Sequence, residues 1–302
     1  MSSTMSEPVT LNRVVVGYDG SAGSVNALTH AARLANDRGH TLVIMMALPH
    51  LNPKMPRTAR AMKLDPDYLA HIKARAQRRL DAAAEQLASQ YPNLTTEVAL
   101  VSADPAGALA AASRDAALVV VGVRGHSAEL LSPMLGGVSG TVIAHALGPV
   151  MVVPGGIHDM ASGPVVVGLV DAADSLAAGQ VAVNEAARRG VGLVALYAWD
   201  LAPDLGDFGA LVHVDPEQTR KELEDMLRQL LAPLEQAHPE VPIERRVVQG
   251  SPRAALVEAS QQASLIVIGS RGLGGFAGLL LGSVSRAVTR ESDCPVIVVR
   301  QR

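Results

Sequence analysis

Hydrophobic positions in this chain fall into short apolar runs separated by longer stretches of helical character. Runs of four or five mostly β-branched residues occur within residues 13–17, 117–122, 164–168 and 265–269. Short continuous runs of this kind are typical of strands that are buried on both faces of a parallel sheet. The alternation of such strands with helices predicts an α/β fold.

The whole pattern occurs twice. Gly17 and Gly39 are separated by the same number of residues as Gly168 and Gly190, without a gap. The repeated segments are helices at 25–37 and 176–189, second strands at 42–47 and 193–198, long helices at 67–90 and 216–237, third strands at 95–101 and 243–248, fourth strands at 117–122 and 265–269, and last strands at 150–153 and 296–299. We therefore expect two tandem doubly wound domains, each a five-stranded parallel sheet flanked by helices. Their expected boundaries are 1–154 and 164–302, with a glycine-rich linker at 155–163.

In sheets of this type, ligands bind beyond the carboxyl ends of the strands, where the strand order reverses. The first and fourth predicted strands end in glycine in both halves, at Gly17 and Gly122 and at Gly168 and Gly269. We expect each pair of strand ends to flank one crevice.

The segment after the fourth strand of the second half carries the clearest chemical signal. Glycines follow the strand closely, and Gly282-Ser283 opens a predicted helix that runs to Glu291. Glycines let backbone N–H groups approach a ligand, and a helix start adds unpaired N–H donors and a positive dipole end. This combination predicts an anion site suited to nucleotide phosphates. Its candidate residues are Gly269, Ser270, Arg271, Gly272, Leu273, Gly274, Gly275, Gly282, Ser283, Val284 and Ser285.

Other interpretations of this segment fit less well. A P-loop requires a lysine at the helix start, and no lysine lies between Ile268 and Arg302. Gly272, Gly274 and Ala277 match a loose dinucleotide pattern, but that fingerprint belongs in the first strand–helix turn of a domain. A turn that packs a helix and holds no ligand remains an alternative.

Composition narrows the class of protein. The 302 residues are 48% hydrophobic and 2% aromatic, with a net charge of -3, which gives no reason to expect nucleic acid or an anionic membrane as a partner. A single cysteine, Cys294, precedes an apolar strand and is expected to pack rather than react. No apolar run reaches the length of a membrane span, so we expect a cytoplasmic protein. The basic run at 71–79 is expected to be a solvated helix face.

The chain resembles the universal stress protein family in its tandem two-domain form. The residues that carry the resemblance are Val-Val-Val-Gly-Tyr-Asp-Gly-Ser at 14–21 and the late motif Gly269-x2-Gly272-x9-Gly282-Ser283. The resemblance implies an ATP site, with or without Mg²⁺, in which the glycine loop surrounds the triphosphate. It further implies that Asp19 contacts the nucleoside and that backbone at Ala47 and Ala198 faces the adenine. Pairing of the two domains through their last strands, and a homodimer, are also implied.

Each half departs from the family pattern in a different place. In the first half, ten residues instead of nine separate Gly122-Val-Arg124-Gly125 from Gly136-Gly137. Gly137 also replaces the expected hydroxyl residue. Glu129 adds a negative charge to that loop. In the second half, Val170 stands where Asp19 stands in the first, with Asp171 one residue later. We expect the second half to bind ATP better, because its phosphate loop is complete.

These features favour a nucleotide-dependent regulator or binding module in the stress response, with an unidentified protein partner. In this hypothesis, ATP orders the loop at 271–281 and changes a surface that the partner contacts. No catalytic or metal-binding residues are predicted, so at most slow hydrolysis is expected. The alternatives are a slow ATPase or phosphotransferase that uses the same site, a scaffold without nucleotide, and a flavodoxin-type electron carrier. The last would need aromatic rings, for which the candidates are Tyr18, Tyr197, Trp199, Phe208 and Phe276.

Overall fold

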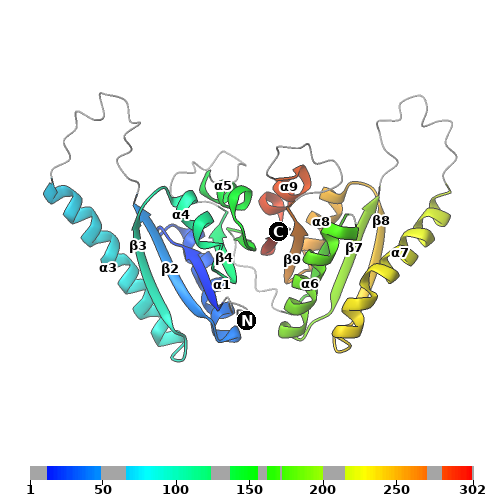
Figure 1. The fold of residues 1–302 in the computed structure, drawn as a ribbon, viewed down its shortest axis with the longest axis horizontal. Coiled ribbons are helices and arrows are strands. Elements are labelled where there is room, and N and C mark those ends of the chain that lie inside the picture. Colours follow the sequence, from blue (N-terminus) through cyan, green and yellow to red (C-terminus); the bar gives the residue numbers. More distant parts are fainter. Residues whose placement is uncertain are drawn as a thin grey trace, which may run out of the picture.

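The computed structural model describes residues 12–48, 66–123, 137–155, 162–170, 172–199, 215–270 and 281–300. Two similar α/β halves lie side by side, with the long helices α3 and α7 at opposite outer ends (Figure 1). The first half consists of β1 (Arg13–Gly17), α1 (Ala22–Arg38), β2 (Thr41–Leu48), α3 (Pro66–Gln90), β3 (Thr96–Ser102), α4 (Pro105–Ala112), β4 (Leu118–Gly122), α5 (Gly137–His145) and β5 (Val150–Val153). The second consists of β6 (Val165–Leu169), α6 (Ala172–Arg189), β7 (Leu193–Trp199), α7 (Pro216–Ala237), β8 (Ile243–Gln249), α8 (Pro252–Ser260), β9 (Leu265–Gly269), α9 (Ser283–Glu291) and β10 (Val296–Val299).

The strands form one continuous sheet in the order β3-β2-β1-β4-β5-β10-β9-β6-β7-β8. Within each half all pairings are parallel, which confirms the predicted fold class. The halves join where β5 and β10 pair antiparallel, with Met151 opposite Ile297. The last strands of the two halves are therefore paired within one chain, as the family resemblance implied.

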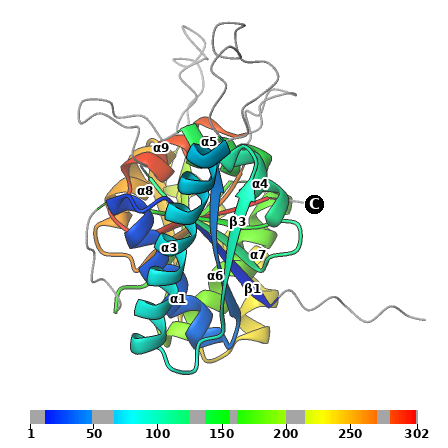
Figure 2. The same cartoon turned by 90° about the vertical axis from the view of Figure 1, so that its left-hand side faces the viewer.

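Apolar side chains fill both faces of this sheet. One core cluster combines β-strand residues with α1, α3, α6 and α7, and it runs through both halves. The other lies between the sheet and helices α4, α5, α8 and α9. The 90° view in Figure 2 shows α3 and α1 on one side of the sheet and α4 on the other. Strands such as β4 and β10 are apolar at nearly every position because helices cover both of their faces.

Helix α1 shows how local sequence sets an element's ends. Its expected start at residue 25 was wrong by one turn. Ser21 caps the helix by accepting a hydrogen bond from the Ser24 amide at 3.2 Å, so the helix begins at Ala22. The small residues of this first turn carry no amphipathic signal. The helix ends at Arg38 and is capped by Gly39, whose φ of 62° is left-handed, as expected for a glycine that follows a helix.

Two polar contacts also join the halves. Arg38 of α1 and Glu185 of α6 form an ion pair at 2.5 Å, and both side chains are buried. Beyond β10, Arg300 donates to the carbonyl oxygens of Ala144 and Ala146 at the end of α5. These contacts link the helices of one half to the strands and helices of the other.

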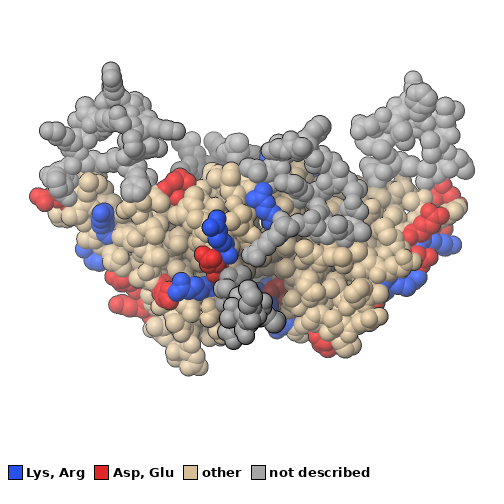
Figure 3. Space-filling model, viewed as in Figure 1, with Lys and Arg blue, Asp and Glu red and all other residues tan. Residues whose placement is uncertain are grey.

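Surface charge is mixed. On the face in Figure 3, Lys and Arg lie among Asp and Glu, and neither sign gathers into one large field. Across the described ranges, no helix combines the length and the apolar character that a membrane span requires.

Candidate functional site

Within each half, the sheet topology places candidate residues at the carboxyl ends of two neighbouring central strands. In the first half the central strands β1 and β4 are neighbours, with Val16 opposite Val120. In the second half β6 and β9 are neighbours, with Gly168 opposite Ile268. The chain turns to opposite faces of the sheet after these strands, so the strand order reverses between them. The ends of these strand pairs therefore lie at the point where parallel α/β sheets bind ligands.

The start of α9 has the features of an anion site. Gly282 is the N-cap residue, in an extended conformation, and its own amide donates to the Ser270 carbonyl at 2.9 Å. No side chain caps this helix among the described residues. The amides of Ser283, Val284 and Ser285 occupy the first turn, where intrahelical acceptors are lacking. They present three N–H donors and the positive end of the helix dipole directly beside the end of β9.

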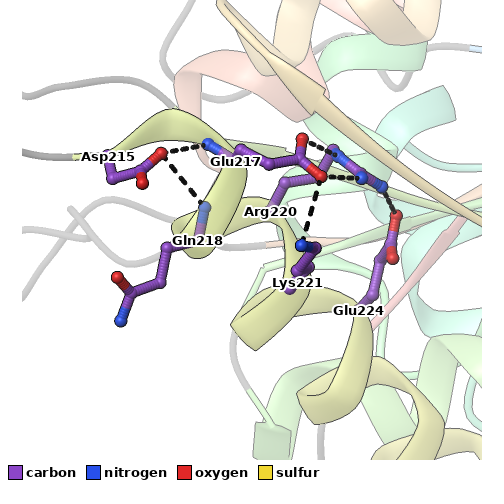
Figure 4. Close-up of polar contacts among 6 residues, drawn as sticks. All are labelled: Asp215, Glu217, Gln218, Arg220, Lys221 and Glu224. Atoms are coloured by element: carbon purple, nitrogen blue, oxygen red, sulfur yellow. Dashed lines mark hydrogen bonds and ion pairs between the residues drawn. The ribbon is translucent and has the colours of Figure 1, made fainter.

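The starts of α7 and α4 are capped by side chains. At α7, Asp215 accepts from the amides of Glu217 and Gln218 at 2.9 and 3.3 Å (Figure 4). At α4, Asp104 accepts from the Gly107 amide at 2.8 Å. Helix α8 has no side-chain cap bond, but its first residue, Pro252, has no N–H to offer. The start of α9 thus differs from these three in having a full set of amides and no capping side chain.

The two serines of α9 have different roles. The Ser285 hydroxyl is buried and donates to the Gly269 carbonyl at 2.8 Å, which fastens the helix to the end of β9. In the first half, Ser139 makes the same bond to Gly122 at 2.6 Å. Ser283 is exposed, so its hydroxyl is the better placed of the two to reach a phosphate.

Three of the predicted glycines allow close packing between elements. A Cβ on Gly122 would lie 2.4 Å from the backbone oxygen of Gly23, at the start of α1. A Cβ on Gly17 would meet Leu109 at 2.8 Å, and one on Gly168 would meet Leu256 at 3.0 Å. For Gly137, no described residue lies within 4 Å of an added Cβ. The first three glycines therefore have a packing reason that the strand pattern did not reveal.

Asp19 lies in a tight turn between β1 and α1. Its carboxylate Oδ1 accepts from the Ser21 amide at 2.9 Å, and Gly20 follows with a left-handed φ of 80°. From α3, the Arg79 guanidinium donates to the Asp19 carbonyl at 3.0 Å. Arg79 is half-buried, so the expectation of a solvated face at 71–79 was wrong for this residue. Sequence reasoning missed it because nothing in the charge run distinguishes Arg79 from Arg78.

The second half keeps only part of this turn. The Val170 amide donates to the Ser175 hydroxyl at 3.1 Å, as the Asp19 amide does to Ser24 at 3.3 Å. Val170 supplies no carboxylate. Asp171 lies outside the described residues.

Ala47 and Ala198 occupy equivalent positions near the carboxyl ends of β2 and β7, opposite Val101 and Val248. Both are half-buried. Several other candidates lie outside the described residues, namely Arg124, Gly125, Gly136, Arg271, Gly272, Leu273, Gly274 and Gly275. Within the described ranges, no group of three or more His, Cys, Asp or Glu side chains could hold a metal ion.

Burial shifts the pKa values of His30 and Cys294 strongly. Burial lowers the pKa of His30 to about 4, and the nearby charges of Arg33 and Arg189 lower it further. Burial raises the pKa of the Cys294 thiol to about 12. Cys294 is 1% exposed, so it packs in the core as expected.

Comparison with known proteins gives a consistent result. The sequence profile of the Universal stress protein family matches residues 10–154 and 162–300. A universal stress protein of Mycobacterium tuberculosis is 36% identical over 98% of this chain and 97% of its own length. The crystal structure of a universal stress protein from Archaeoglobus fulgidus covers 97% of this chain with a TM-score of 0.69 and 17% identity. A universal stress protein solved in complex with cAMP covers 47% of the chain at 31% identity and a TM-score of 0.33. This chain belongs to the universal stress protein family.

Proposed function

We propose that this chain is an ATP-binding regulatory module, and that the polyphosphate tail binds at the start of α9. The observation that carries the proposal is the uncapped first turn of α9, with the amides of Ser283, Val284 and Ser285 beside the end of β9. Backbone donors at a helix start suit a phosphate group without any lysine.

The fixed position of this helix supports the proposal. The Ser285–Gly269 bond and the Gly282–Ser270 bond hold the first turn against the end of β9. Preorganised donors cost little to order when an anion arrives. Mg²⁺ would bind as part of a Mg²⁺–nucleotide complex, because the ion retains several coordinated waters and is held mainly by the phosphates.

The first half is proposed to bind ATP more weakly. Gly137 lacks the hydroxyl that Ser283 provides at the matching position. Among the described residues, nothing lies within 4 Å of a Cβ added there. Gly137→Ser is therefore a direct test of whether the missing hydroxyl limits this half.

The remaining parts of the proposal follow from family membership. We propose domains at 1–154 and 164–302, a cytoplasmic location, a role in the stress response, a protein partner that senses nucleotide occupancy, and a homodimer.

A slow ATPase that uses the same site is the second candidate function, favoured by the exposed Ser283 hydroxyl.

Calorimetric titration of the full chain with ATP, in the presence of Mg²⁺, tests the proposal. We expect saturable binding that Gly282→Asp weakens by at least about tenfold, because a carboxylate would then lie among the phosphate donors. The matched control is Gly155→Asp, since Gly155 lies outside the α9 turn, has no positive φ, and has no described residue within 4 Å of an added Cβ. No binding by the wild-type chain would contradict the proposal. Single-turnover assays with labelled ATP separate a regulator from a slow enzyme.

A further inference from the structure

Arg79 holds the turn that carries Asp19. Its Nη1 donates to the Asp19 carbonyl at 3.0 Å. Its side chain also covers Gly20, because a Cβ added there would lie 3.0 Å from Arg79 Cδ and 3.1 Å from Nη1. One long side chain from α3 thus contacts two successive residues of the β1–α1 turn.

The turn is fixed from its other sides as well. The Tyr18 amide donates to the Met45 carbonyl at 2.9 Å, and the Asp19 amide donates to the Ser24 hydroxyl at 3.3 Å. The Asp19 carboxylate accepts from the Ser21 amide at 2.9 Å. The backbone of Asp19 is therefore held at both its N–H and its C=O, which fixes the point from which its carboxylate extends.

The second half has neither an aspartate nor an arginine at the positions that correspond to Asp19 and Arg79. Leu80 and Leu87 of α3 correspond to Leu227 and Leu234 of α7, all four of them buried in the same core cluster. This correspondence places Met226, which is 39% exposed, at the position of Arg79. Val170 stands at the position of Asp19. The half without the carboxylate is also without the guanidinium.

We infer that Arg79 is a positioning residue for Asp19, and that the two halves recognise different parts of a nucleotide. The first half binds the nucleoside through the fixed Asp19 turn, and the second half binds the polyphosphate tail through the α9 amides. This inference rests on the proposed function, and it adds a residue and a division of ligand preference that the proposed function does not contain. A guanidinium suits the task because it can donate to a carbonyl while its stem covers the glycine beneath it.

The test titrates the full chain with two probes, adenosine and inorganic tripolyphosphate. Arg79→Met installs the second half's residue, and we expect it to weaken adenosine binding by about tenfold or more while tripolyphosphate binding stays unchanged. Gly282→Asp should weaken tripolyphosphate binding and leave adenosine binding unchanged. Arg79→Lys should recover much of the adenosine affinity, since an ammonium group can still donate to the Asp19 carbonyl.

Thermal unfolding of each variant distinguishes a role of Arg79 in positioning Asp19 from a role in stabilising the fold. A merely structural role for Arg79 would lower the melting temperature and weaken both probes together, which would overturn the inference. Unchanged adenosine binding in Arg79→Met, or no adenosine binding by a chain that binds ATP, would also overturn it. Failure of the wild-type chain to bind ATP would instead overturn the proposed function.

Discussion

The Glu185 carboxylate lies 2.5 Å from the Arg38 guanidinium, although the two residues belong to different halves of the chain. Arg188 and Arg189 of Glu185's own helix approach the same carboxylate at 3.3 and 3.7 Å. Glu185 is 4% exposed and Arg38 is 8% exposed. One buried acid therefore compensates basic side chains from both α1 and α6.

Glu185→Gln should destabilise the chain by about 3–5 kcal/mol, because it leaves the buried Arg38 charge without its partner. Urea unfolding at neutral pH measures the effect. The control is Glu217→Gln, since Glu217 pairs with Arg220 on the exposed surface of α7 (Figure 4). Exposed pairs contribute about 0.2–1 kcal/mol, so the control should change stability little. Equal effects of the two substitutions would contradict the buried pairing.

The ion pair shows where sequence reasoning ends. Strand and helix positions were predicted mostly to within one or two residues, because buried β-branched runs and helix-terminal glycines leave local signals. The pairing of β5 with β10 was expected from the family resemblance, but its antiparallel direction was not predicted. Arg38 and Glu185 gave no signal, since contacts between residues so far apart in the chain depend on how the halves dock.

The same limit applies to the candidate site. The start of α9 was predicted correctly at Gly282-Ser283, because a glycine before a serine-rich first turn is a local feature. The packing roles of Gly17, Gly122 and Gly168 depend on helices that approach from elsewhere. The contact of Arg79 with Asp19 is likewise tertiary, so a charge pattern alone could not predict it.

Stability should fall as the pH drops from about 6.5 towards about 4. The folded chain keeps His30 neutral because its pKa is lowered to about 4, whereas the unfolded chain binds a proton near its ordinary pKa. The unfolded state therefore gains protons first, and acid favours unfolding. His30→Val installs the residue of the equivalent second-half position, Val181, and should remove about 1–3 kcal/mol of this pH dependence. Denaturant unfolding at pH 7 and pH 5 measures it. An identical pH slope in both proteins would contradict the assignment.

Gly122→Ala should destabilise the chain by more than about 2 kcal/mol. Its new Cβ would lie 2.4 Å from the Gly23 carbonyl oxygen, and backbone cannot move aside as a side chain can. Gly137→Ala is the control, because Gly137 lies in a helix and no described residue is within 4 Å of its added Cβ. That substitution should be neutral or stabilising by up to about 1 kcal/mol. Thermal unfolding distinguishes them, and a harmless Gly122→Ala would show that β4 and α1 are not in close contact.

The thiol of Cys294 should resist alkylation in the folded protein at pH 8. It is buried, and its pKa is raised to about 12, so little reactive thiolate forms. Mass spectrometry after iodoacetamide treatment should find modification only once the chain is unfolded in denaturant. Rapid labelling of the native protein would place Cys294 outside the core.

The central claim is that the first-turn amides of α9 hold a polyphosphate tail. The most direct measurement is the change in amide NMR resonances of Ser283, Val284 and Ser285 when ATP, and separately inorganic tripolyphosphate, is added. We predict that all three resonances shift with both ligands. The amide of Glu217 should stay in place, because it already donates to Asp215 at the start of α7. ATP binding that leaves the three α9 amides unmoved would contradict the account.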